Sequence, residues 1–290
     1  MAETSRPVIA AHYWSMYDMT PEAACARAAS LGYRGLDLAS GDLGNGTRID
    51  LEELAGNQQL ARRLTAAATN AGIEFTDFFA ALPYPVNDQD RANREANRQL
   101  FRALTERLVA MGVPGVTLSP GGYLPDSPED ALPRACDELA QLVVIGRDAG
   151  IRVRVEPHLE SVADTPARTA TLLRETPGLT LTLDYSHFIA AGFAQCEIEP
   201  LNRCATHWHA RQSRPGRLAS EVSNGTIDYA RIFDDLRGAG YSGAVTTEYV
   251  RSLWQGQDLV DSDRENELMR RELVGLLKVR WPDEAEVDAS

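Results

Sequence analysis

The sequence lacks the features that would mark a disulfide-stapled, zinc-finger or membrane-spanning protein. Its 290 residues include four cysteines, which are Cys25, Cys136, Cys196 and Cys204. No two of them form a CxxC pair, and scattered cysteines in a chain of this length predict reduced thiols. No apolar run approaches the roughly 20 residues that a membrane-spanning helix needs, so we expect no membrane segment.

Positive charge is also scarce. The chain has 29 lysines and arginines against 42 aspartates and glutamates, which gives a formal net charge of −13. Because an acidic surface repels phosphate backbones, we expect no nucleic-acid partner, although a local basic cluster could bind a small anion. The first residues show no basic segment followed by an apolar run, so we expect no signal peptide and a cytoplasmic location.

No linker, low-complexity run or change of composition divides the chain before its end. With 43% hydrophobic and 24% charged residues, the composition is typical of a globular protein. We therefore expect one domain over residues 1–281 and an acidic, disordered tail over residues 282–290.

Short apolar runs alternate with helical patterns along this domain. The eight runs that predict strands cover residues 8–14, 35–39, 74–79, 115–119, 151–156, 179–184, 205–209 and 244–248. Between them, Thr20 and Ser127 each precede a proline, and Asp50 and Asp228 precede helical patterns, as is typical of helix N-caps. Eight strand–helix units favour an α/β fold with a single (β/α)8 TIM barrel; the alternative, a doubly wound sheet, would not need eight.

Four consecutive predicted strands end in a side chain that can bind a metal. Side chains alternate between the two faces of a strand, and Asp184 is the last inward-facing residue of the run "LTLTLD". Glu156, His209 and Glu248 hold the same position in their own strands. Because barrel enzymes place their chemistry at the C-terminal ends of the strands, these four side chains predict a site at the mouth of the barrel.

Three carboxylates at one barrel mouth would repel each other unless a cation lay between them. Together with His209, the carboxylates of Glu156, Asp184 and Glu248 suit Mn²⁺, Co²⁺ or Mg²⁺ better than a structural Zn²⁺. The residues therefore predict one divalent metal ion, which would also supply a Lewis acid. A single acid at a strand end can equally be a helix N-cap or a surface charge, so the prediction depends on all four occurring together.

Some inward-facing residues favour a structural interpretation instead. Arg152 and Arg154 share the inward face of their strand, and a buried guanidinium needs an acid. Asp37 and Asp77 on the second and third strands are the candidates. His207 is inward-facing as well, and it is either a core residue beneath the site or a further ligand.

Several segments resemble one known family. "LGYRGLDL" is similar to its second-strand signature, and "NGTIDYARIFDDLRGAGYSGAVTTE" is similar to its segment before and through strand eight. "EPH", "LDYSH" and "HWHAR" resemble its ligand-bearing strands. On these motifs the chain resembles, over nearly its whole length, the xylose isomerase-like barrels. This superfamily of sugar phosphate isomerases and epimerases includes D-tagatose 3-epimerases, inosose dehydratases and α-subunits of C-glycoside deglycosidases.

The resemblance implies roles for individual residues. Glu156, Asp184, His209 and Glu248 match the metal ligands, and Glu156 and Glu248 match the catalytic pair that works from opposite faces of the substrate. The substrate-binding residues that we expect are His158, His187, Arg214, Arg217 and Trp14. The rim aromatics of the first loop, Trp14 among them, could stack on a sugar face or simply pack at the rim.

One position departs from the family pattern. Many relatives have an acidic residue shortly after the histidine ligand, where this chain has Gln212. Gln212 begins a long loop, residues 212–225, which carries three arginines when Arg211 is counted with it. These arginines either bind a carboxylate, phosphate or sugar hydroxyls, or are simply solvated.

The reaction that the resemblance implies is metal-dependent isomerisation or epimerisation of a keto-sugar. A proton would leave the carbon next to the carbonyl through a metal-bound enediolate, with Mn²⁺ the metal that we expect. The alternative is a lyase or dehydratase that acts on a keto-sugar, inosose or 3-keto-(C-)glycoside by the same chemistry. The expected partner is a small sugar or glycoside. We also expect a homo-oligomer, and a small partner subunit if the protein is a deglycosidase.

Two other classes share this barrel. DNA-repair endonucleases of this barrel type have sites for several metal ions, with more histidines. This chain has five histidines in all, and its acidic net charge opposes DNA binding. A non-catalytic sugar-binding subunit would be expected to have lost a ligand, and here all four positions are filled.

Overall fold

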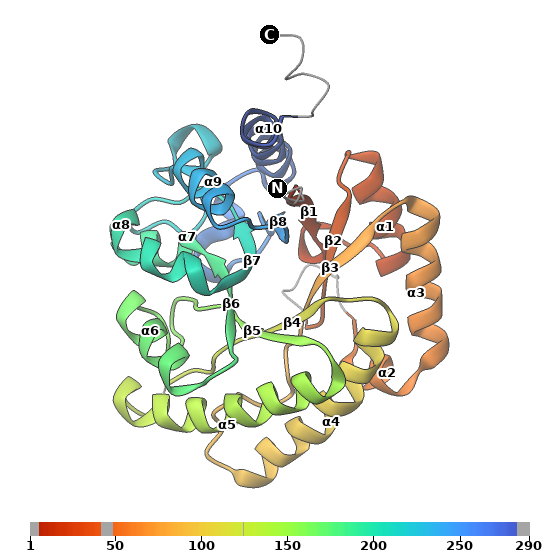
Figure 1. The fold of residues 1–290 in the computed structure, drawn as a ribbon, viewed down its shortest axis with the longest axis vertical. Helices are drawn as coiled ribbons and strands as arrows, with labels where there is room; N and C mark the ends of the chain where they lie inside the picture. The colour runs from red at the N-terminus through yellow and green to blue at the C-terminus, as the bar shows by residue number, and fades with distance from the viewer. Residues whose placement is uncertain (1–5, 42–48, 124, 283–290) are drawn as a thin grey trace.

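The chain folds into a closed barrel of eight parallel strands with helices around it (Figure 1). The computed structural model describes residues 6–41, 49–123 and 125–282. The strands are β1 Val8–His12, β2 Gly35–Ala39, β3 Glu74–Phe79, β4 Gly115–Leu118, β5 Arg152–Val155, β6 Thr180–Asp184, β7 Ala205–Ala210 and β8 Ala244–Thr247. Each strand pairs with the next, and β8 pairs with β1. The prediction of a single (β/α)8 TIM barrel is confirmed.

Helices connect the strands and cover the outside of the barrel (Figure 1). The α-helices are α1 Pro21–Ser30, α2 Leu51–Gly56, α3 Gln58–Ala71, α4 Arg91–Ala110, α5 Pro128–Ala149, α6 Pro166–Glu175, α7 Tyr185–Ala190, α8 Gln195–Ile198, α9 Tyr229–Gly238 and α10 Ser262–Arg280. The 3-10 helices are η1 Tyr13–Ser15, η2 Glu199–Cys204, η3 Val222–Asn224 and η4 Trp254–Leu259. Among the described residues, none of the helices is long and apolar enough to cross a membrane.

The predicted helix starts are confirmed. The side chains of Thr20, Asp50, Ser127 and Asp228 each accept a backbone N–H from the first turn of the helix that they precede. These bonds satisfy donors that have no partner within the helix.

The predicted strands lie close to the observed ones, and the largest difference is at the first. There β1 ends at His12, because the His12 side chain accepts the backbone N–H of Trp14 and the chain turns into η1. Of the predicted tail, residues 283–290 lie outside the described residues, so the tail remains a prediction.

The interior of the barrel is polar, while the side chains between the strands and the helices are apolar. Thr182 of β6 lies 2.5 Å from Thr117 of β4 across the barrel axis, whereas Leu181 and Leu183 are buried on the opposite face of the same strand. This is the alternation that places Asp184 inside the mouth.

An ion pair lies near the bottom of the barrel. Arg154 Nη1 is 2.5 Å from Asp77 Oδ1, and the two side chains are 3% and 1% exposed. Asp77 is therefore the acid that Arg154 needed. The expectation that Arg152 is buried beside it is wrong: Arg152 is the first residue of β5 and is exposed at the end of the strand.

We expect Asp77→Ala to destabilise the protein strongly. It leaves the Arg154 guanidinium buried without its acid, which costs on the order of 3–5 kcal/mol of unfolding free energy. Urea unfolding measures the difference. The matched control is Asp148→Ala, which removes the exposed pair Arg147–Asp148 and should cost less than about 1 kcal/mol. Equal effects would contradict the expectation.

Candidate active site and metal centre

The four predicted ligands meet at the C-terminal end of the barrel. Asp184 ends β6, His209 lies near the end of β7, and Glu156 and Glu248 directly follow β5 and β8. All four are buried. His209 Nδ1 lies 2.7 Å from Glu156 Oε1 and 3.2 Å from Glu248 Oε2. Strand alternation therefore located a real cluster of side chains.

Asp184 joins this cluster from the side of Glu156. Ligand atoms of Glu156, Asp184 and His187 lie within 4.8 Å of one another, and so do those of Glu156, His209 and Glu248. Asp184 Oδ1 also accepts the backbone N–H of Ser186 and so caps α7. The carboxylate of Asp184 therefore does two things: it caps α7, and it takes part in the cluster at the barrel mouth.

Burial and crowding displace the proton affinities of these groups from their ordinary values. Burial raises the pKa of Glu156 to about 7, and the charges of Glu248 and Asp184 act in the same direction. Burial also acts on Glu248, but the cations of His209 and Arg211 hold its pKa below the usual value. Burial opposes the charge of His209, yet Glu248 and Glu156 hold its pKa well above the usual value. Without a metal, the carboxylates retain a proton on His209.

The donor set fits a divalent cation. Glu248 Oε2 is buried and accepts no hydrogen bond from the part of the chain that the structure describes, although His209 Nδ1 and Arg211 Nη2 approach to 3.2 and 3.3 Å. A buried oxygen without a hydrogen-bond donor needs an explanation, and a bound ion is one. Carboxylate oxygens with one imidazole nitrogen are ligands that Mn²⁺, Co²⁺ and Mg²⁺ accept.

Arg211 lies in the site, although the sequence reasoning named it only as an arginine beside the loop and expected Arg214 and Arg217 to bind the substrate. Its buried guanidinium donates to Asp184 Oδ2 at 2.7 Å, to Ser186 Oγ at 2.8 Å and to Gln257 Oε1 at 2.8 Å. Burial opposes this charge, but the carboxylates of Asp184 and Glu248 raise the pKa of Arg211 and keep it charged. Arg211 stands two residues after His209, so the alternation that identified His209 could have identified it too.

A cavity of about 170 Å³ opens beside the carboxylates. Its lining includes Glu156 and Glu248, together with the predicted residues Trp14, His158 and His187. A larger cavity of about 370 Å³ lies elsewhere, against α1 and α10, and is lined by none of the predicted site residues. We regard the smaller cavity as the candidate substrate site because Glu156 and Glu248 line it and do not line the larger one.

The structure does not bring Arg214 and Arg217 to this cavity. Arg214 is exposed, and the two residues pair through their backbones in a turn of the loop. Gln212, where relatives have an acid, ties the loop down instead: its side-chain amide bonds both backbone groups of Ile227. A Cβ on Gly225 would lie 2.1 Å from Gln212 Oε1, so the glycine makes room for this amide.

The connection after β8 adds an aromatic wall that the sequence reasoning did not predict. Trp254 lines the cavity, and its ring meets the His158 ring edge-on at 6.2 Å. Trp254 Nε1 and Gln255 Nε2 both donate to the carboxylate of Glu160, at 3.2 and 3.0 Å. Glu160 and Gln255 have left-handed backbones, with φ of 67° and 55°. Such strain in non-glycine residues is typical of functional segments.

His12 contributes a hydrogen-bond donor at the mouth. Its Nδ1 accepts the backbone N–H of Trp14, so in the neutral ring the proton is on Nε2, which lies 4.0 Å from Glu248 Oε1. Burial lowers the pKa of His12 to about 4. The ring is therefore neutral near pH 7 and presents an N–H toward the carboxylates.

Comparison with solved structures shows the same fold in proteins of low sequence identity. A D-psicose 3-epimerase from Clostridium cellulolyticum H10, in crystals with D-tagatose, gives a TM-score of 0.74 at 16% identity over 93% of this chain and 99% of that one. The E. coli 3-keto-D-glucoside 4-epimerase gives 0.70 at 17% identity, over 93% and 99%. An IolI protein with a bound zinc atom gives 0.71 at 15% identity, over 95% and 100%.

A search of curated proteins finds no match. The family model described as xylose isomerase-like TIM barrel matches residues 25–273, which is most of the chain. The resemblance seen in the sequence is thereby confirmed. The chain belongs to the family of xylose isomerase-like TIM barrels.

Proposed function

We propose that the protein is a divalent-metal-dependent sugar isomerase or epimerase that removes the proton next to the carbonyl of a keto-sugar. The observation that carries this proposal is the cavity itself. The two glutamates that follow β5 and β8 line it beside two tryptophans. His209 contacts both glutamates, and Asp184 lies within 4.8 Å of Glu156. Relatives of the same fold that are sugar epimerases support the proposal.

Glu156 and Glu248 are the proposed proton-transfer groups. Their pKa values move apart, because burial raises that of Glu156 to about 7 while His209 and Arg211 lower that of Glu248. These directions describe the site without a metal. A bound cation would displace the proton of Glu156, and each carboxylate could then accept a proton from the sugar and return it. A divalent cation held by Glu156, Asp184, His209 and Glu248 would polarise the carbonyl oxygen and so acidify the neighbouring carbon.

The remaining lining residues are proposed to bind and orient the sugar. The His158 and His187 rings can bond sugar hydroxyls, while Trp14 and Trp254 offer faces for the apolar side of a sugar ring. Arg211 stabilises the buried negative charge around Asp184. The same proton removal followed by loss of a β-substituent would make the protein a lyase, so the products decide between these reactions.

Proton exchange in D₂O tests the proposed chemistry. Wild type with Mn²⁺ should exchange the hydrogen next to the carbonyl of at least one of a panel of keto-sugars and 3-keto-glycosides, followed by NMR. Glu156→Gln and Glu248→Gln should each lower the rate by a factor on the order of 10² or more, since positioned acids and bases contribute about 10²–10⁴. Arg214→Gln, outside the cavity, is the matched control and should not change it.

The products of this assay separate the outcomes. Exchange with an intact carbon skeleton supports isomerisation or epimerisation, whereas release of water or an aglycone assigns a lyase. No exchange with any keto-substrate, in protein that binds Mn²⁺, would sink the proposal and favour a sugar-binding subunit.

We expect Mn²⁺ binding to release protons and to weaken as the pH falls. Glu156, whose pKa burial raises to about 7, and His209, whose pKa the glutamates hold well above its usual value, both carry protons below pH 7. A metal must displace these protons, so affinity decreases with acidity. Calorimetry in buffers of different ionisation enthalpy counts the protons, about one to two per metal at pH 6. A pH-independent affinity between pH 6 and 8 would contradict this expectation.

We expect Trp254→Ala to raise KM about tenfold with little change in Mn²⁺ affinity. Loss of an aromatic face from the cavity removes on the order of 1.4 kcal/mol of sugar binding. The matched control is Leu253→Ala, because Leu253 is 85% exposed and does not line the cavity. An unchanged KM in Trp254→Ala would show that this wall does not contact the substrate.

A further inference from the structure

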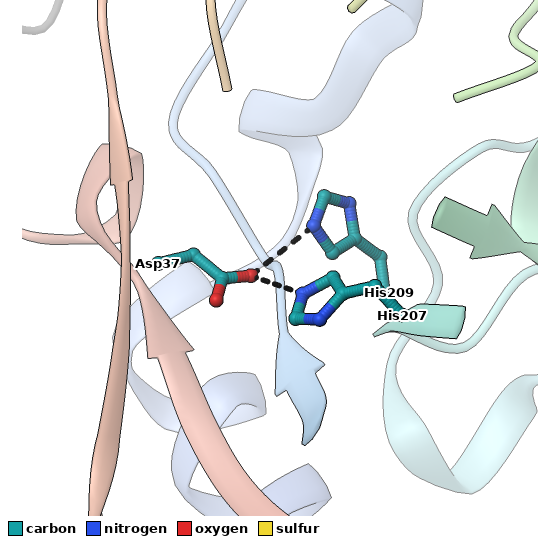
Figure 2. A group of neighbouring side chains, drawn as sticks. All are labelled: Asp37, His207 and His209. Carbon is teal, nitrogen blue, oxygen red and sulfur yellow. Dashed lines mark hydrogen bonds and ion pairs between the residues drawn. The ribbon is translucent and has the colours of Figure 1, made fainter. Parts of the chain in front are cut away.

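A second group of buried polar side chains lies inside the barrel, next to the metal ligands. Asp37 of β2 approaches His207 and His209 of β7 (Figure 2). Its Oδ2 lies 2.6 Å from His207 Nε2 and 3.4 Å from His209 Nε2. All three side chains are about 1% exposed. Strands β2 and β7 are not neighbours in the sheet, so these contacts cross the barrel interior.

Asp37 is held in place on both sides. Its Oδ1 accepts a hydrogen bond from Thr76 Oγ1 at 2.5 Å, and its Oδ2 interacts with His207. The strand register shifts immediately before Asp37 in the β2–β3 pair, and before Thr182, the partner of His207, in the β6–β7 pair. Such irregularities redirect side chains and are frequent beside active sites.

This geometry distinguishes the two nitrogens of His209. Nδ1 faces Glu156 and Glu248, at 2.7 and 3.2 Å, while Nε2 faces Asp37. A metal needs a nitrogen without a proton, and a histidine ligand commonly directs its other N–H to a carboxylate. In the structure Nδ1 is hydrogen-bonded to Glu156 Oε1, whereas Nε2 makes no hydrogen bond within the described residues and lies 3.4 Å from Asp37 Oδ2. With a metal at Nδ1, the remaining ring proton would be on Nε2, where the carboxylate of Asp37 could accept it.

We propose that Asp37, held by His207 and Thr76, is the positioning residue that fixes the tautomer and ring orientation of His209 for metal binding at Nδ1. Asp37 does not line the candidate substrate cavity, so it acts through His209. The 2.6 Å separation of Asp37 and His207 is that of a hydrogen bond, which leaves no room for an ion between them. This inference rests on the proposed metal-dependent function.

Asp77 provides a matched control. Asp77 is the register partner of Asp37 on the neighbouring strand and is equally buried, but it pairs with Arg154, away from the ligands. Asp37→Asn and Asp77→Asn therefore remove the same charge from adjacent positions of the barrel interior. Only Asp37→Asn removes the carboxylate that faces His209.

The test is Mn²⁺ affinity by calorimetry at pH 7.5, together with ¹⁵N spectra of His209 in the Zn²⁺-loaded protein. Asp37→Asn should weaken Mn²⁺ binding by about 10- to 100-fold, the usual cost of losing such a partner. Asp77→Asn should change it by less than about twofold even if unfolding stability falls. With Zn²⁺ on Nδ1 the ring proton of His209 is on Nε2. Its signal should lie downfield and exchange slowly with solvent in wild type and Asp77→Asn, and it should shift upfield and exchange faster in Asp37→Asn.

Each outcome separates the two hypotheses. Wild-type affinity together with a wild-type Nε2–H signal in Asp37→Asn would overturn this inference alone. Equal weakening of Mn²⁺ binding by both variants would also overturn it, since that would indicate general loosening. Absence of Mn²⁺ binding by wild type would overturn the proposed function and this inference together. If Asp37→Asn does not fold, His207→Gln, which removes one of the two groups holding Asp37, should still weaken Mn²⁺ binding several-fold; unchanged affinity would overturn the inference.

Discussion

The burial of negative charge at one end of a closed barrel is the constraint on which this structure depends. The carboxylate residues Glu156, Asp184 and Glu248 lie together and are at most 5% exposed. A buried group of like charges is stable only when cations or protons balance it. Arg211 and a protonated His209 balance it within the chain. A divalent metal would replace that proton. The same three carboxylates that give the site its chemistry therefore also lower the stability of the fold, because burying their charge costs free energy.

The same principle is repeated down the barrel axis. Asp77 pairs with Arg154 near the bottom, Asp37 pairs with His207 above it, and His209 contacts Glu156 at the mouth. Threonine hydroxyls fill the space between these charges. Each buried acid thus has a cation or hydrogen-bond donor close by, and the groups that stabilise the interior also orient the ligands.

The acidic residues of the site and its aromatic wall come from different parts of the barrel. The acids come from strand ends, whose positions the sheet fixes, while the aromatic wall comes from connections. Trp254 and Gln255 depend on Glu160 for their position, and two of these three residues have a left-handed backbone. Barrel folds in general combine strand-end residues that the sheet fixes with loops that differ between proteins.

The sequence by itself determined the barrel and the four strand-end side chains that cluster at its mouth, because hydrophobic alternation is local and decides which side chains face inward. It did not identify Arg211 over Arg214, the contact of Trp254 with Glu160, or the pairing of Asp37 with His207. The last two join residues 94 and 170 positions apart. Those contacts depend on the closure of the barrel, on register shifts within it and on strained loop backbones, and no local pattern encodes their distances.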